Sequence, residues 1–188
     1  MKRKTDSLIT YGTRLRNGGD ATVTVRRAES DLPTWEASLD AVPHFGNKEH
    51  IGAGVLRLSR HETPAAWRVW RRFLRVQPVA HVAIEALAVS DRQTGAGVAT
   101  GLLYTALRHE DGVNTKTMVT FDIPQYGGRT EALCAWAGHV GLRQSPEESR
   151  TDGYYRFEAP VSDVMVAIQD GYPKIAQGSV ARGTVSAQ

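Results

Sequence analysis

The stretch VAIEALAVSDRQTGAGVATGLL, residues 82–103, carries the strongest structural signal in the chain. It begins with the mostly aliphatic segment 82–89, which predicts a buried β-strand. A glycine-containing turn over residues 92–97 follows. Apolar residues at helical spacing then predict a helix, and they are Val98, Ala99, Leu102, Leu103, Ala106 and Leu107.

The turn has the composition of an anion-binding site. Gly95 and Gly97 let backbone N–H groups converge at the start of the helix. The amides of the first helical turn have no partner within the helix, and the helix dipole adds partial positive charge there. Such groups bind phosphate or pyrophosphate, so we expect the chain to hold a phosphorylated ligand.

Two other phosphate-binding glycine motifs are excluded by the residues around the turn. The loop of nucleoside triphosphatases needs lysine and then serine or threonine after its last glycine, but an apolar pair follows Gly97. The dinucleotide motif G-x-G-x-x-G fails because the third glycine, Gly101, stands one residue too far along. The pattern that remains is Arg-x-x-Gly-x-Gly, formed by Arg92, Gly95 and Gly97.

This pattern resembles the acyl-CoA pyrophosphate loop of the GNAT N-acetyltransferase family, and the preceding run IEALAVSD, residues 84–91, resembles that family's fourth strand. The alternative is an ordinary strand–turn–helix whose glycines serve packing. The resemblance extends over residues 21–160. Outside the central stretch, residues 22–31 resemble the family's first strand and the start of its first helix. Residues 113–121 resemble its fifth strand, residues 130–140 its fourth helix, and residues 153–158 a late strand.

The resemblance implies an α/β (α+β) fold. Its central sheet is mixed, mostly antiparallel, splayed between the fourth and fifth strands, and flanked by helices. It also implies acetyl-CoA as the co-substrate. Exposed strand edges often pair in this fold, which makes a homodimer our expectation for the assembly.

The cofactor-binding residues follow from the same resemblance. Backbone groups of Leu87, Ala88 and Val89 would pair with the pantetheine arm as with an added strand. Arg92 would supply positive charge near the phosphates. Backbone amides along the turn would bind the pyrophosphate, from Gln93, Thr94, Gly95, Ala96, Gly97, Val98 and Ala99.

Acyl transfer to an amine needs a base that deprotonates the ammonium group, and it benefits from a proton donor to the leaving thiolate. Glu85 is the first candidate base, because a carboxylate inside an apolar strand costs free energy unless it faces a polar cleft. Some family members carry a catalytic glutamate in this strand. A glutamate that faces solvent or pairs with an arginine is the alternative. Asp122, at the end of the expected fifth strand, is the second candidate.

The proton donor has no clear motif position. Many family members use a tyrosine four residues before a Gly-Phe pair, which Gly141-Leu142 replaces here; the corresponding residue is Ala137, which cannot donate a proton. Tyrosines near the site by topology are Tyr126, Tyr154 and Tyr155, of which Tyr154 is our candidate. Another group or solvent is the alternative.

A helix is predicted to start at Thr63-Pro64, where a hydroxyl cap precedes a proline. Four arginines fall on one arc of this helix, namely Arg68, Arg71, Arg72 and Arg75. They form either a solvated surface or a surface that binds the phosphates of a nucleic acid. The second interpretation fits GNAT-type toxins that act on aminoacyl-tRNA, which residues 78–103 and 141–146 resemble.

Three functions therefore stay open. The first is an acyl-CoA-dependent N-acetyltransferase that acts on a primary amine of a small molecule or protein. The second is an enzyme of the same fold whose amine acceptor belongs to a nucleic acid, on aminoacyl-tRNA or an amino-modified base. The third is a non-catalytic acyl-CoA-binding protein with the GNAT fold.

Composition sets broader limits. A chain of 188 residues with a net charge of +3 fits one globular domain. No apolar run is long enough to span a membrane, the beginning of the chain lacks the apolar stretch of a signal peptide, and the single Cys134 suits a reducing compartment, so we expect a cytoplasmic protein without membrane contact. The spacing of His44, His50 and His61 matches no metal-ligand set, and no metal is expected.

The order of segments along the chain gives the remaining expectations. Residues 1–20 are expected to form a flexible basic arm, residues 21–160 the acyltransferase domain, and residues 161–188 a partly disordered tail that begins with a short helix over 162–169. Asp31 as a cap and Pro33 in a first turn predict a helix from Asp31 to Val42. Residues 50–59 are expected to form a strand.

Overall fold

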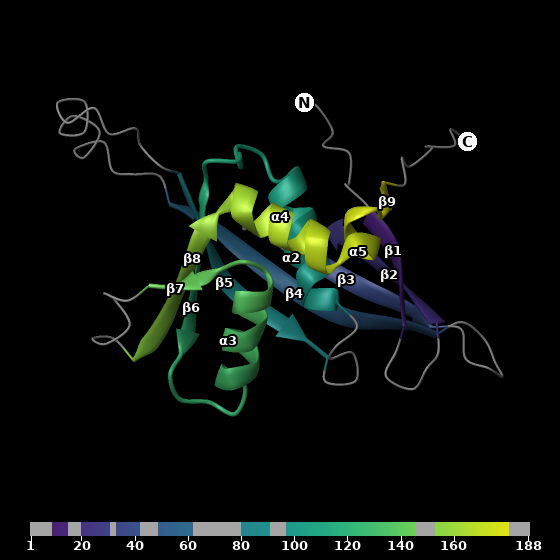
Figure 1. Cartoon of the computed structure of the whole chain (residues 1–188). Helices are drawn as coiled ribbons and strands as arrows, with labels where there is room; N and C mark the ends of the chain where they lie inside the picture. Colours follow the sequence, from purple (N-terminus) through teal and green to yellow (C-terminus); the bar gives the residue numbers. More distant parts are fainter. Residues whose placement is uncertain are drawn as a thin grey trace. The chain divides into compact units, whose positions relative to one another are not determined.

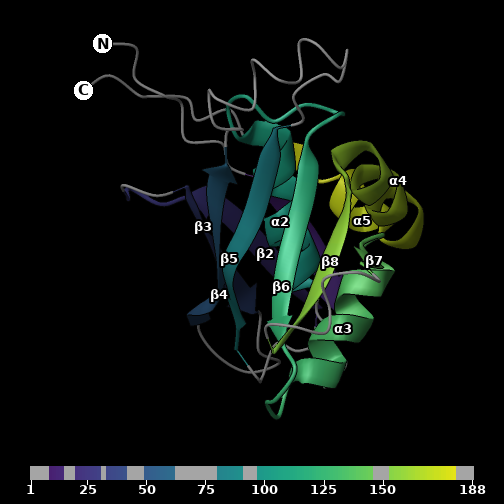
Figure 2. The same ribbon diagram turned by 90° about the vertical axis from the view of Figure 1, so that its left-hand side faces the viewer.

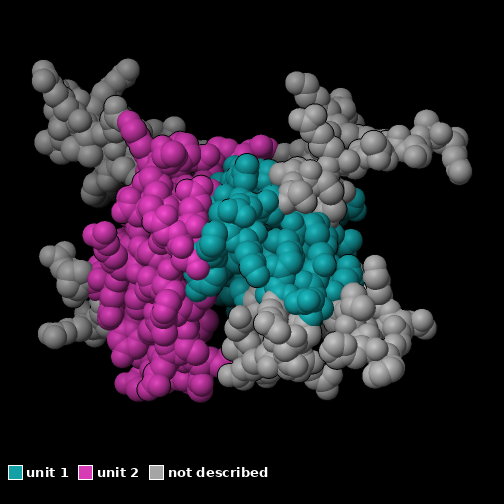
Figure 3. Space-filling view, turned by 45° about the vertical axis from the view of Figure 1, so that its right-hand side comes forward, with its two compact units in different colours: residues 1–57, 86–110, 172–188 teal, residues 58–85, 111–171 magenta. Residues whose placement is uncertain are grey.

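The computed structural model describes residues 9–14, 20–30, 33–41, 49–61, 80–90, 97–145 and 153–180. They belong to two compact units, shown in two colours in Figure 3. Unit 1 comprises residues 1–57, 86–110 and 172–188, and unit 2 comprises residues 58–85 and 111–171. Two long strands, β4 (Glu49–His61) and β5 (His81–Val89), contribute residues to both units.

The strands of unit 1 follow the order β5-β4-β3-β2-β1-β9. Every pairing from β4 through β3 and β2 to β1 and β9 is antiparallel. Helix α2 packs against β2 and β3, and the short helix α5 packs against β1 and α2 (Figure 1). The bounds are β1 Ile9–Arg14, β2 Asp20–Arg27, β3 Thr34–Ala41, α2 Val98–His109, α5 Pro173–Ala176 and β9 Ser179–Val180.

The core of unit 1 lies between α2 and the strands that it covers. Alternate residues of β2 and β3 are buried, including Val23, Trp35 and Leu39, and Leu102 and Leu103 of α2 are fully buried. Burial of such aliphatic and aromatic side chains supplies the main free energy that holds the helix on the sheet.

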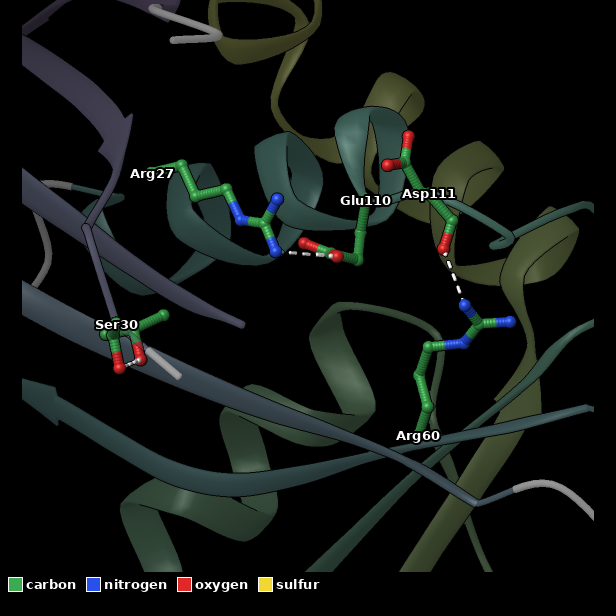
Figure 4. Close-up of polar contacts among 6 residues, drawn as sticks. Arg27, Ser30, Arg60, Glu110 and Asp111 are labelled. Atoms are coloured by element: carbon green, nitrogen blue, oxygen red, sulfur yellow. Dashed lines mark hydrogen bonds and ion pairs between the residues drawn. The ribbon is translucent and has the colours of Figure 1, made fainter. Parts of the chain in front are cut away.

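The C-terminal end of α2 is fixed to β2 by an ion pair. Arg27 Nη2 lies 3.1 Å from Glu110 Oε1, and the Glu110 side chain is only 5% exposed (Figure 4). In the described part of the chain, the second carboxylate oxygen of Glu110, Nε2 of His109 and Nε1 of Trp35 are buried without a hydrogen-bond partner. The Trp35 and His109 rings lie 6.5 Å apart, so these polar groups gather at one end of α2.

The strands of unit 2 follow the order β7-β8-β6-β5. β5 and β6 are parallel, whereas β6–β8 and β7–β8 are antiparallel (Figure 2). Helix α3 packs on β6 and helix α4 packs on β8. The bounds are β6 Met118–Pro124, α3 Thr130–His139, β7 Arg143–Gln144, β8 Tyr154–Pro160 and α4 Val161–Gly171.

The turn before β6 is built by hydrogen bonds within the chain. Asn114 accepts a bond from the backbone amide of Lys116 through its side chain, and its own backbone amide donates to the hydroxyl of Thr117. In the same unit, Arg60 Nη1 donates to the backbone oxygen of Asp111 at 3.0 Å (Figure 4).

Most predicted elements are confirmed. The fold is of the α/β class, with a mixed, mostly antiparallel sheet and flanking helices. The strand at 82–89, the helix from Val98, the strand at 50–59 and the helices at 130–140 and 162–169 all form, with small shifts at their ends. The strand expected at 113–121 instead starts at Met118, because residues 114–117 form the Asn114 turn.

The helix predicted from Asp31 to Val42 is wrong. Residues Thr34–Ala41 form strand β3, in which buried Trp35, Ala37 and Leu39 alternate with more exposed polar residues. That alternation has the two-residue period of a strand with one buried face. The proline and the polar residues before it were misread as a helix start.

Described elements also lie outside residues 21–160, the range expected for the acyltransferase domain. Residues Ile9–Arg14 form β1, which pairs with β2 and β9, so the prediction of a flexible arm is wrong for them. Beyond residue 160, helices α4 and α5 and strand β9 belong to the packed units. None of the described helices is both long and apolar enough to cross a membrane.

Candidate active site

The glycine turn ends at Gly97, the N-cap residue of helix α2. Gly97 has φ 74° and ψ 11°, a left-handed conformation that glycine adopts at little cost. Within the described ranges no side chain caps the helix, and no acidic residue stands in its first turn. The N-terminal amides of α2 therefore keep their capacity to bind an anion. The predicted residues Arg92, Gln93, Thr94, Gly95 and Ala96 lie outside the described residues.

Strand β5 brings the other predicted cofactor residues to the same unit. Ala88 is exposed, and Leu87 and Val89 are partly exposed. Ala88 and Val89 line a hollow of about 590 Å³ together with residues of β2, β3 and β4 that include Arg26, Glu36 and Val55. This part of β5 is therefore partly open to solvent within unit 1.

A glycine of β4 lies close to both β5 and α2. A Cβ atom at Gly54 would lie 2.8 Å from the backbone oxygen of Ala88 and 3.1 Å from Cγ1 of Val98. Any side chain at this position would push β4 away from β5 or from the helix. Gly54 is thus required for this packing, which the sequence alone did not reveal.

The parallel pairing of β5 with β6 in unit 2 ends at Ile84 and Phe121. Glu85 and Asp122, the two predicted bases, are the next residues of the two strands. The family resemblance predicts that these two strands splay apart, without giving the position. The topology therefore places both carboxylates at equivalent positions beyond the last strand pair.

The two carboxylates differ in their partners. Glu85 is exposed and accepts a hydrogen bond from the hydroxyl of Ser59 on β4. Asp122 is held by Arg156 of β8 through two bonds, from Nε to Oδ1 at 2.8 Å and from Nη2 to Oδ2 at 2.9 Å. Because the Arg156 guanidinium occupies both of its carboxylate oxygens, Asp122 is the less available proton acceptor. Ser59 and Arg156 were not identified from the sequence.

The tyrosine candidates occupy different positions. Tyr154 lies on β8 opposite Pro124 of β6 and is 47% exposed. Tyr126 is 87% exposed in the turn after β6. Ala137, where the family resemblance predicts a tyrosine, is fully buried and offers no proton donor. Neighbouring Trp136 packs edge-on against Phe121, which gives it a role in the core.

The remaining candidate residues from the sequence are three histidines, four arginines and Cys134. The side chains of His50 and His61 and the whole of His44 lie outside the described part, as do Arg68, Arg71, Arg72 and Arg75. No group of three or more potential metal ligands is found among the residues that the structure describes. Cys134 is a partly buried free thiol whose pKa is raised by desolvation, so thiolate chemistry is not favoured there.

Comparisons with known proteins return similar solved structures. Arabidopsis thaliana NAA60 in complex with acetyl-CoA aligns with a TM-score of 0.48 and 14% identity, over 70% of this chain and 77% of that chain. The same protein with a bisubstrate analogue gives a TM-score of 0.47, 13% identity and the same coverage, 70% and 77%. An insect protein from the yellow fever mosquito, provisionally named arylalkylamine N-acetyltransferase 7, gives 0.48 and 11% identity over 86% of this chain and 98% of that chain. A scan against family models and a search of curated proteins find no match.

Proposed function

We propose that this chain is an acyl-CoA-dependent N-acetyltransferase of the GNAT superfamily, which transfers an acetyl group to a primary amine of a small molecule or protein. The observation that carries the proposal is the left-handed Gly97 at the start of α2, where none of the described side chains caps the helix, in a sequence whose preceding β5 segment resembles the family's cofactor strand. A helix N-terminus of this kind favours a pyrophosphate. Acetyl-CoA is the donor that the family uses most often.

Unit 1 supplies the proposed cofactor contacts. The amides of Gly97, Val98 and Ala99 bind the pyrophosphate, together with Arg92, Gln93, Thr94, Gly95 and Ala96 of the turn. Leu87, Ala88 and Val89 pair with the pantetheine arm through their backbone groups. The accessibility of β5 in unit 1 supports this assignment.

Glu85 is the proposed general base. Its carboxylate accepts a proton from the acceptor ammonium, directly or through a water molecule, and the free amine then attacks the thioester carbon. The C–S bond breaks, and the attacking nitrogen loses its second proton to solvent as the amide forms. The thiolate of CoA takes up a proton, for which Tyr154 is the proposed donor, and solvent then reprotonates Tyr154. The hydrogen bond from Ser59 orients the Glu85 carboxylate, while the ion pair with Arg156 leaves Asp122 in a structural role.

Calorimetric titration with acetyl-CoA, CoA and NADH tests the proposal. We expect acetyl-CoA to bind at micromolar concentrations and NADH to give no signal. Failure of every CoA species to bind would overturn the proposal, because the glycine turn would then serve packing alone.

An acceptor screen follows binding. Release of CoA is measured with a thiol-reactive dye in a Cys134→Ser variant, so that the protein's own thiol adds no background. Candidate acceptors are alkylamines, arylalkylamines, peptides with free amino groups and aminoacyl-tRNA. Activity on aminoacyl-tRNA alone would move the acceptor to the nucleic-acid class. Binding without turnover of any acceptor would favour a non-catalytic acyl-CoA-binding protein.

A further inference from the structure

The hydroxyl group of Tyr11 in β1 is bonded to the cofactor turn. It donates a hydrogen bond to the backbone oxygen of Gly97 at 3.1 Å. The same oxygen accepts the first helical bond of α2, from the amide of Gly101 at 2.8 Å. Both lone pairs of the Gly97 carbonyl are thus used, one by the helix and one by the N-terminal strand.

The third glycine of the turn region accommodates the Tyr11 ring. A Cβ atom at Gly101 would lie 2.1 Å from the Tyr11 hydroxyl oxygen and 2.6 Å from its Cζ. Only glycine permits this approach, which explains the spacing G-x-G-x-x-x-G that fits no dinucleotide motif. Gly101 therefore serves a contact between β1 and α2 rather than a phosphate.

The C-terminal segment supports the turn from another side. Ile175 of α5 is 4% exposed, and its Cδ1 lies 3.2 Å from the position of a Cβ at Gly97. Strand β9, which follows α5, pairs with β1 through Ile9–Val180 and Thr10–Ser179. Strands β1 and β9 are thus paired with each other. Tyr11 of β1 and Ile175 of α5, the helix that precedes β9, both lie next to Gly97.

We infer that Tyr11 and Ile175 are positioning residues that hold Gly97 in the conformation required for pyrophosphate binding. This inference rests on the proposed function. Burial raises the pKa of the Tyr11 phenol well above its ordinary value, so the hydroxyl stays protonated and keeps donating at all physiological pH values. The buried contacts supply rigidity to a turn whose ligand contacts are made by the backbone.

The test compares two tyrosine variants in the full-length chain. Tyr11→Phe removes the hydroxyl that bonds Gly97 and keeps the ring. Tyr104→Phe is the matched control, because Tyr104 is also buried in unit 1 and its hydroxyl is bonded only weakly, by Arg108 at 3.4 Å. Calorimetry with CoA measures binding, and thermal unfolding without ligand measures stability. We expect Tyr11→Phe to raise the Kd for CoA about fivefold and Tyr104→Phe to leave it unchanged.

A second pair of variants covers the case in which Tyr11→Phe does not fold. Ile175→Val removes the Cδ1 atom beside Gly97, and Ile168→Val removes the same atom from a buried isoleucine of α4 in unit 2. We expect Ile175→Val to weaken CoA binding about twofold to threefold and Ile168→Val to leave it unchanged, since a methyl group at the turn acts only through packing.

The outcomes separate the two proposals. If the wild-type chain binds CoA and each variant binds as its control does, the positioning role is wrong while the proposed function stands. If the wild-type chain binds no CoA species, the proposed function itself fails. Weaker binding by Tyr11→Phe or Ile175→Val than by its control, measured on folded protein, supports the inference.

Discussion

The cofactor region of unit 1 and the carboxylate region of unit 2 are built in opposite ways. At Gly97 the groups that we propose to bind the cofactor are backbone amides, and the side chains that lie next to Gly97, Tyr11 and Ile175, are buried. At the end of the β5–β6 pairing the candidate groups are exposed carboxylates, those of Glu85, the proposed base, and of Asp122, which is ion-paired with Arg156. The conformation of the first region is held by buried packing contacts, whereas the proposed role of the second depends on the chemical groups of exposed side chains. Substitutions in the first should therefore change binding and stability together, and substitutions in the second should change the rate alone.

Replacement of Glu85 is the strongest test of this difference. Glu85→Gln removes the proposed base and keeps the size of the side chain, so we expect kcat to fall by about 10²- to 10⁴-fold. The Kd for CoA and the melting temperature should stay unchanged because the residue is exposed. Asp122→Asn is the control and should lower kcat far less than Glu85→Gln. Equal losses for both variants would show that the ion-paired aspartate takes part in proton transfer.

The next effect is expected at the far end of α2 in unit 1. Arg27→Met leaves the buried carboxylate of Glu110 without its partner, which should lower the free energy of unfolding by about 1 to 3 kcal/mol. Its neighbour provides the control, because Arg26 forms an ion pair with Glu36 in which both side chains are well exposed. Arg26→Met should cost less than about 0.5 kcal/mol. Urea unfolding of both variants measures the difference, and equal losses would contradict the role assigned to burial.

Substitution of two glycines that lie in helices, Gly101 in unit 1 and Gly138 in unit 2, compares the packing within each unit. Gly101→Ala forces a methyl group into the Tyr11 ring, so we expect a loss of about 1 to 2 kcal/mol and weaker CoA binding. Gly138→Ala in α3 meets no atom within 4 Å and should stabilise by about 0.5 to 1 kcal/mol, because alanine loses less backbone entropy in a helix. Denaturant titration measures the free energy of unfolding of both variants. An unchanged stability of Gly101→Ala would show that the Tyr11 ring does not restrict the space at Gly101.

The smallest expected effect concerns pH. Desolvation, and to a lesser extent the nearby Arg108 guanidinium, lowers the pKa of His109. The unfolded chain then binds a proton more readily than the folded chain, so stability should fall as the pH drops below about 6.5, the ordinary histidine value. His109→Gln should flatten this dependence of the melting temperature between pH 7 and pH 5. His139→Gln, an exposed histidine at the end of α3, is the control and should leave the dependence as it is in the wild type.

Two segments, residues 34–41 and the segment around Ile9, differ from the sequence predictions for physical reasons. A proline, Pro33, and a cap-forming residue, Asp31, precede β3, and these local signals favour a helix. The decisive burial of Trp35, Ala37 and Leu39 comes from packing against other elements. The segment around Ile9 was expected to be flexible because it lies among polar and glycine residues. Its pairing with both β2 and β9 depends on residues up to 171 positions away in the chain.

The sequence by itself determined the strand at residues 82–89 and the helix that starts after Gly97, because their periodicity and glycines are local properties. It also located the two carboxylates that follow the last β5–β6 pair. Only the tertiary structure decided that Ser59 bonds Glu85, that Arg156 holds Asp122, and that Tyr11 and Ile175 support Gly97. Each of these contacts joins residues far apart in the chain, so it is set by the packing of the strands and helices and leaves no periodic trace in the sequence.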